Sequence, residues 1–164
     1  MKYQIIIKII ILPLFIFAMG CVPQQYRPIE ITKVVKVPNQ NQKALYKKTR
    51  QWFSQYFVSG KSVVDYENPK AGTIIGNGIA RIGSDPFGLI KYDIEYNIRI
   101  DTKNGRFRAI TKINKHTNTD RSSTYTVNSV SKKREDNAAN HVNEIVNKIK
   151  LYVTDKKHGS SSNW

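Results

Sequence analysis

The chain has 164 residues, which fits one domain and leaves little room for a second. Hydrophobic residues make up 40% of it and charged residues 24%, a balance that excludes a wholly disordered chain. The formal net charge of +15 favours anionic partners such as nucleic acid, phosphate-bearing lipid, acidic polysaccharide or an acidic protein, although a basic envelope protein without such a partner has the same balance. A single cysteine, Cys21, excludes a disulfide within the chain and a cysteine-based metal site.

The first twenty residues have the pattern of a signal peptide. Lys2 supplies the positive start, and Ile9 to Met19 forms an apolar stretch of the usual length. This stretch is shorter than the roughly 20 apolar residues that span a bilayer, and Lys8 interrupts any longer one. We therefore expect residues 1–20 to be cleaved, the alternative being a transmembrane anchor.

The stretch ends in Ala18-Met19-Gly20-Cys21, which resembles a lipobox, the processing site of bacterial lipoproteins. The resemblance implies that the Cys21 thiol receives diacylglycerol and that cleavage then exposes an amino group for further acylation, for example with palmitate. At about 0.8 kcal/mol per buried CH₂, two or more chains anchor a protein stably. The expected location is the cell envelope, with membrane lipid as a partner. Val22 takes the place of the Asp that often retains lipoproteins at the inner membrane, which favours the outer membrane where two are present.

Residues 21–28 contain Pro23 and Pro28 among polar residues and indicate a lipidated tether. The alternation of Ile29 to Val37 then predicts a strand that opens a domain over residues 29–154. Asn39 or Asn41 is positioned to cap the helix that follows.

Residues 42–58 have helical spacing, and Gly60 is a stop signal. Six residues form the expected buried face: Leu45, Thr49, Trp52, Phe53, Tyr56 and Phe57. Four basic residues lie mostly away from it, with no acid in the segment: Lys43, Lys47, Lys48 and Arg50. This basic helix face is the candidate binding surface.

Four strands are expected next, over residues 62–66, 72–82, 89–101 and 106–114. The third alternates without a break from Ile90 to Asp101, so that one side is suited to complete burial. Lys103-Asn104-Gly105 predicts a hairpin turn between the last two.

Residues 117–131 are rich in Ser, Thr and Asn, and indicate either a loop or a weak edge strand. Residues 136–153 have helical spacing, and residues 155–164 form a polar tail. The order β-α-β-β-β-β-α predicts a single α+β domain, in which a curved, mostly antiparallel sheet of about five strands carries two helices on one face.

The chain resembles a family of uncharacterised bacterial domains with a fold like that of the TATA-box-binding protein. The resemblance is carried by Ala44-Leu45-Tyr46, Trp52-Phe53, the segment from Gly72 to Gly78, and the strand from Tyr92 to Ile100. It covers about Ile29 to Lys115, and members often follow a lipoprotein signal. The family has no established activity, and similarity of fold alone is not evidence of DNA binding.

No residue pattern favours catalysis, a cofactor or a metal. Gly76-Asn77-Gly78 lacks the context of a phosphate loop and indicates a bulge or bend in a strand. Asp93 and Glu95 share a strand face with basic neighbours, which predicts cross-strand ion pairs. No ligand spacing joins the histidines His116, His141 and His158.

The basic helix face has three interpretations: it binds lipid headgroups, it binds nucleic acid with the help of exposed aromatic rings, or it is only solvated. We expect a non-enzymatic lipoprotein whose domain binds another envelope component or a protein partner. The alternative is a polyanion-binding module for nucleic acid or acidic polysaccharide at the membrane surface.

Overall fold

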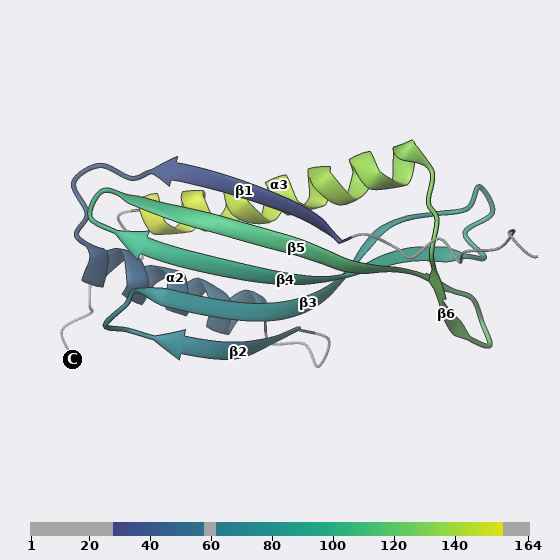
Figure 1. The fold of residues 1–164 in the computed structure, drawn as a ribbon, viewed down its shortest axis with the longest axis horizontal. Helices are drawn as coiled ribbons and strands as arrows, with labels where there is room; N and C mark the ends of the chain where they lie inside the picture. The colour runs from purple at the N-terminus through teal and green to yellow at the C-terminus, as the bar shows by residue number, and fades with distance from the viewer. Residues whose placement is uncertain (1–27, 58–61, 156–164) are drawn as a thin grey trace, which may run out of the picture.

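The computed structural model describes residues 28–57 and 62–155, which form an antiparallel sheet covered on one face by helices (Figure 1). In these residues the sheet has six strands in the order β1-β5-β4-β3-β2, and β6 pairs with β5. The elements in chain order are β1 (Ile29–Lys36), α2 (Gln42–Tyr56), β2 (Ser62–Asn68), β3 (Thr73–Ser84), β4 (Lys91–Lys103), β5 (Arg106–Thr119), β6 (Thr124–Val127) and α3 (Lys132–Thr154). The α+β class and the two helices on one face of an antiparallel sheet are confirmed.

The expected signal peptide, the tether apart from Pro28 and most of the polar tail lie outside the described residues. Among the helices that are described, none has the length and apolar character needed to cross a bilayer.

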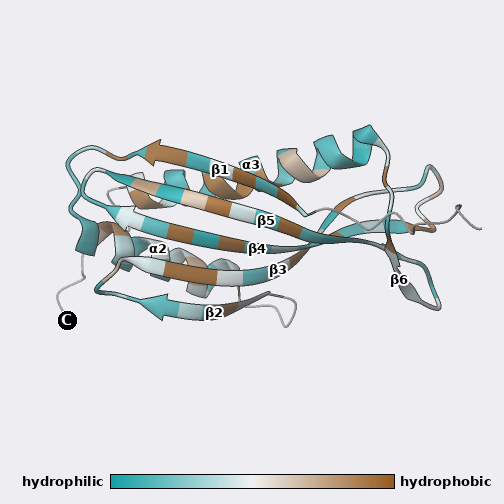
Figure 2. Cartoon of the chain, viewed as in Figure 1, coloured by the Kyte–Doolittle hydropathy of each residue, from teal (hydrophilic) through white to brown (hydrophobic). Residues whose placement is uncertain are grey.

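The strands alternate between a buried face and an exposed one, as Figure 2 shows for β4 and β5. On β4 the side chains of Ile94, Ile98 and Ile100 are fully buried beneath the helices. Their neighbours Glu95, Asn97 and Arg99 lie on the other side of the sheet. The period of two in the sequence therefore sets which face becomes the core.

The strand expected to end at Asn114 continues to Thr119, and the last four residues of this extension pair with β6. Residues 117–119 thus belong to a strand, and β6 is the weak edge strand that was one of two alternatives. The extension passes an irregularity in the pairing with β4, where Glu95 faces Lys115 but Tyr96 faces Ile113. The extra residue reverses the alternation, so that His116 is buried in place of Lys115.

The segment expected to begin β4 at Leu89 is partly a turn. Ile90 donates its backbone N–H to the Asp85 carboxylate at 2.8 Å and accepts a hydrogen bond from the Asp85 N–H at 2.9 Å. Because these two bonds close the connection, β4 begins only at Lys91.

Asn41 caps α2 by accepting a hydrogen bond from the backbone N–H of Ala44 at 2.8 Å. Asn39 instead has a left-handed backbone with φ 63°, in the turn before the helix. Tyr56 differs from expectation: 56% of its surface is exposed, although it was assigned to the buried face. It is the last residue of α2 and stacks on the outer side of Trp52, with the ring centroids 4.9 Å apart, while Trp52 itself is buried.

The glycines of Gly76-Asn77-Gly78 allow large aromatic rings to approach the strand. A Cβ at Gly76 would lie 2.9 Å from Phe53 Cε1, and one at Gly78 would lie 2.6 Å from Tyr96 Cζ. Pairing with β4 is regular through both positions. The motif therefore serves close packing.

Helix α3 begins at Lys132, one turn before the expected start, and crosses the sheet towards α2. Near its start the Asn137 amide donates to the Ile82 carbonyl of β3 at 3.2 Å. Near its end the Val153 carbonyl accepts hydrogen bonds from Gln40 and Lys48 at 2.6 and 3.0 Å. The helix therefore connects the two ends of the domain beneath the sheet.

Candidate functional site

The structure divides the basic helix face predicted from the sequence. Lys48 donates to the carbonyls of Val153 and Asp155, both at 3.0 Å, and so stabilises the carboxyl end of α3. Arg50 forms an ion pair with Glu67 of β2 at 2.7 Å. Lys43 and Lys47 are exposed and form no ion pair or hydrogen bond within the described residues. Two of the four cations are thus occupied by structural contacts, because the helix turns Lys48 towards α3 and Arg50 towards β2.

The helices cover one side of the sheet, and we call the opposite side the open face (Figure 1). On β1, β3, β4 and β5 its basic residues are Lys36, Arg81, Lys91, Arg99, Lys103, Arg106, Arg108, Lys112 and Lys115. Its acidic residues on the same strands are Glu30, Asp93, Glu95 and Asp101. The open face therefore carries more positive than negative charge.

The acids on the open face are largely neutralised by neighbouring strands. Asp93 pairs with Arg81 of β3 at 3.1 Å, and Glu95 pairs with Lys115 of β5 at 3.1 Å. These are the cross-strand ion pairs expected for the two carboxylates. Their partners come from the adjacent strands, which places both acids in a structural role.

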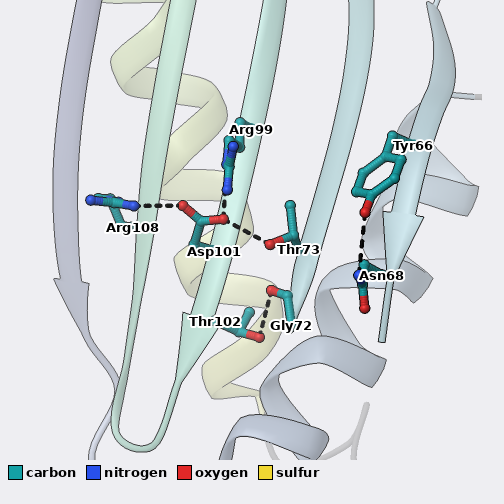
Figure 3. A network of polar contacts seen from close by, with 8 residues as sticks. All are labelled: Tyr66, Asn68, Gly72, Thr73, Arg99, Asp101, Thr102 and Arg108. Carbon is teal, nitrogen blue, oxygen red and sulfur yellow. Dashed lines mark hydrogen bonds and ion pairs between the residues drawn. The ribbon is translucent and has the colours of Figure 1, made fainter. Parts of the chain in front are cut away.

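Asp101 lies between two arginines (Figure 3). Its carboxylate accepts hydrogen bonds from Arg99 at 2.9 Å, Arg108 at 2.8 Å and the Thr73 hydroxyl at 2.9 Å. Burial raises the pKa of Asp101, but these three hydrogen bonds outweigh it and hold the pKa below its usual value. The negative charge of Asp101 thus pairs with two positive charges, those of Arg99 and Arg108.

At the end of the sheet beyond Asp101, three cations stand side by side on the open face. Arg106 of β5 is in register with Lys36 of β1 on one side and with Lys103 of β4 on the other. None of the three forms an ion pair with a described residue. Like charges directly opposite each other destabilise a sheet. We call this group, together with Arg108, the basic corner.

The basic corner is held in place by the segment that leads into α2. The Gly105 N–H donates to the Gln40 carbonyl at 2.8 Å, and the Val37 N–H donates to the Gly105 carbonyl at 2.8 Å. The Asn104 side chain accepts a hydrogen bond from the Gln42 N–H at 2.8 Å. The β4–β5 turn is therefore fastened to the start of the helix, which fixes the cations next to it.

Two hollows adjoin each other at the basic corner. One is lined by Lys36, Gln42, Ala71, Lys103, Asn104, Gly105 and Arg106. The other is lined by Val34, Asp101, Lys103, Arg106, Phe107 and Arg108. Lys103 and Arg106 belong to both, so a ligand in either hollow lies beside positive charge.

The remaining candidates for chemistry are the histidines and Cys21. His116 is fully buried in the sheet and His141 lies on α3, where its ring centroid is 6.5 Å from that of Tyr96. Burial lowers the pKa of both histidines. In the described part of the chain, no group of three His, Cys, Asp or Glu residues is placed to hold a metal ion. His158 and Cys21 lie outside the described residues.

Sequence reasoning missed the basic corner. The hairpin Lys103-Asn104-Gly105-Arg106 places two cations opposite each other, and this could have been read from the turn alone. The position of Lys36 depends on the pairing of β1 with β5, which are separated by some seventy residues in the chain. No local signal indicates that pairing.

The comparisons with known proteins agree with this fold. The family model described as a domain of unknown function (DUF4468) with TBP-like fold matches residues 32–115. The crystal structure of a DUF4468 family protein from Bacteroides ovatus has a TM-score of 0.61 and 16% identity, covering 84% of this chain and 92% of that chain. A TBP-like protein from Parabacteroides distasonis has a TM-score of 0.61 and 14% identity, covering 83% of this chain and 99% of that chain.

No curated protein is similar to the chain at a significant level. At the identities of the two crystal structures, the similarity shows the fold alone. The family model, however, matches just over half of the chain and coincides with the region that carries the resemblance in the sequence. This chain therefore belongs to the DUF4468 family of domains of unknown function with a TBP-like fold.

Proposed function

We propose that this protein is a lipid-anchored, non-enzymatic binding module of the cell envelope, and that its basic corner holds an anionic polysaccharide. The observation that carries the proposal is the register of Lys36, Arg106 and Lys103 across three strands. An oxyanion bound among them replaces mutual repulsion with attraction, so the cost of placing them together is recovered on binding.

A polymer fits this surface better than a small anion. Along β5, Arg106, Arg108 and Lys112 lie on the open face at alternate positions, with Ile110 between the last two. Residues two apart on a strand are separated by about 6.8 Å, so these cations form a row that suits a ligand with repeated charges.

Polysaccharide is favoured over nucleic acid by the lack of stacking surface at the corner. Binding of single strands commonly uses exposed aromatic rings on which the bases stack. Phe107 is the aromatic residue among those lining the two hollows, and it is fully buried. The corner therefore offers charge and hydrogen-bond donors but no platform for bases.

The binding proposal is tested on heparin, with the full mature chain in detergent and a salt gradient. The variant Lys103→Ser with Arg106→Ser should elute at lower salt, and the salt dependence of its binding should fall by about two units of slope. The matched control is Lys43→Ser with Lys47→Ser, which removes the same charge from α2 and should elute close to the wild type.

Loss of retention in the α2 control alone would place binding on the helix and refute the basic corner. Unchanged retention in both variants would refute a localised site. A parallel measurement with single-stranded DNA distinguishes the polymers: tighter binding to DNA than to heparin at equal salt would refute the preference for polysaccharide.

The anchoring proposal is supported by the lipobox-like sequence before Cys21 and is tested separately. Intact-mass analysis of the membrane fraction should find a mature chain that begins at acylated Cys21. The variant Cys21→Ser should accumulate as a precursor that retains residues 1–20. An unmodified Cys21 in the wild type would refute the lipid anchor and leave the binding proposal standing.

A second candidate is an acidic envelope protein. It is favoured by the large apolar side chains on the same open face, because Val34, Tyr66 and Ile79 are 60%, 48% and 42% exposed. Protein interfaces combine such apolar residues with a charged rim. Cross-linking in intact cells from a cysteine at Ile79 would capture this partner, whereas a polysaccharide ligand would leave the protein uncross-linked to other chains.

A further inference from the structure

The turn between β3 and β4 presents two apolar side chains to the outside. Phe87 is 83% exposed, more than any other large hydrophobic residue of the described chain, and Leu89 is 53% exposed. Leaving apolar surface of this size in water costs free energy. We call the segment from Asp85 to Ile90 the hairpin tip.

The hairpin tip is an ordered turn. Two hydrogen bonds join Asp85 and Ile90: the Ile90 N–H donates to the Asp85 carboxylate, and the Asp85 N–H donates to the Ile90 carbonyl. The Gly88 N–H donates to the Asp85 carbonyl at 3.0 Å. Gly88 has φ 68°, a left-handed conformation that favours glycine. The turn therefore holds Phe87 and Leu89 outward.

The tip lies at the end of the molecule from which the chain enters β1 (Figure 1). Ile29, the first residue of β1, faces Ile113 of β5, whereas Lys91 beside the tip faces Thr119. These positions on β5 are six residues apart, or about 20 Å. Lys91 thus lies past the start of β1 by this distance, and the hairpin tip lies beyond Lys91.

The segment before β1 is long enough for Cys21 to reach the level of Lys91, at the base of the tip. Eight residue steps separate Cys21 from Ile29, and an extended chain covers at most about 3.5 Å per residue, or roughly 28 Å. Because β1 is antiparallel to β5, its first residue, Ile29, is the end of β1 that lies nearer to Thr119. A membrane that holds acylated Cys21 is therefore within reach of the tip.

We propose that the hairpin tip inserts Phe87 and Leu89 into the membrane surface that holds acylated Cys21, so that the domain has a second, apolar contact with lipid. This inference rests on the proposed anchoring. The protein then has two attachments to the bilayer, and one of them belongs to the folded domain.

A neighbouring aromatic residue supports a lipid surface as the occupant. Tyr125 of β6 is 46% exposed and pairs with Asn118 near the same end of β5. Its ring joins an apolar body to a polar hydroxyl, as is typical of residues at a membrane interface.

The charges near the tip indicate that the contact is apolar. The basic residues there are Lys91, Arg121, Lys132, Lys133 and Arg134, and the acidic ones are Asp85, Asp120, Glu135 and Asp136. Because these charges nearly balance, we expect insertion to depend only weakly on the anionic lipid content.

The contact fixes the orientation of the domain. The basic corner lies at the first residues of β5 and the tip lies beyond its last, and fourteen residues of strand span about 45 Å. With the tip in the membrane, the basic corner faces away from the bilayer, where an envelope polysaccharide is accessible.

The test uses the full processed chain in phosphatidylcholine vesicles, with and without phosphatidylglycerol. Phe87→Cys is labelled with an environment-sensitive fluorophore, and some vesicles contain lipids with a nitroxide quencher. The matched control is Leu151→Cys, which replaces a side chain that is 69% exposed near the end of α3, at the opposite end of the domain. The wild type serves as the labelling blank.

At position 87 we expect the emission to shift to shorter wavelength and to be quenched by the nitroxide lipids, to a similar extent in both vesicle types. At position 151 we expect neither effect. A label at position 87 that stays water-exposed while Cys21 is acylated would overturn the tip contact alone. Equal quenching at both positions would overturn the orientation. A shift at position 87 without lipid quenching, growing with protein density, would mean that a second copy covers the tip.

The wild type separates failure of the tip contact from failure of the anchor. Cys21 is the single cysteine, and acylation of its thiol leaves nothing to label. Labelling of the wild type would show a free Cys21 and overturn the anchoring, and the tip proposal with it.

Discussion

Replacing Arg106 with glutamate should stabilise the protein even though it removes part of the proposed binding site. Arg106 faces Lys36 and Lys103 directly, and opposite charges in such positions contribute roughly 0.2–1 kcal/mol per pair, with like charges destabilising by similar amounts. Arg106→Glu turns two repulsive pairs into two attractive ones. We expect the free energy of unfolding to rise by about 1–2 kcal/mol, a value that salt reduces because the screening length is only about 8 Å at physiological ionic strength.

Urea unfolding of the mature chain, measured at low and high salt, gives this change. The matched control is Lys112→Glu on the same strand, since Lys112 faces Glu30 and Asn97. There the substitution turns an attractive pair into a repulsive one, and the free energy of unfolding should fall. A decrease for Arg106→Glu, or the same direction of change in both variants, would refute the reasoning from cross-strand charge.

Two further predictions concern the core. Gly78→Ala should lower the free energy of unfolding by about 1–3 kcal/mol, because the new Cβ would lie 2.6 Å from the buried Tyr96 ring. Denaturant melts measure this loss. Adding Tyr96→Leu to the same chain should recover part of it. Burial lowers the pKa of His116 and His141. Below about pH 6.5 the unfolded chain therefore binds protons that the folded chain excludes. The free energy of unfolding should decrease from pH 7 to pH 5 for this reason. The urea midpoint should depend less on pH when both are replaced by glutamine; an unchanged slope would mean that neither histidine is responsible.

Much of the fold was predictable because it depends on periodicity. The alternation in β4 and the helical spacing in α2 and α3 decide which side chains face the core, and each element needs only its own residues to express that pattern. The Asn-Gly turn after Lys103 likewise follows from its own two residues, of which Gly105 takes the left-handed backbone with φ 70°. The family resemblance was visible in the sequence for the same reason, since its motifs are structural.

The functional surface was less predictable, because it depends on which strands become neighbours. Lys48 and Arg50 were expected to share a free basic face with Lys43 and Lys47, but partners distant in the sequence, α3 and Glu67, bind them. Conversely, the basic corner exists only because β1 lies beside β5. A strand's sequence specifies its inward face, whereas pairing between distant strands is set by the packing of the whole sheet against its helices. By itself, the sequence determined the elements, the core and the candidate lipid anchor; the tertiary structure alone decided which charges are neutralised and which remain together on the surface.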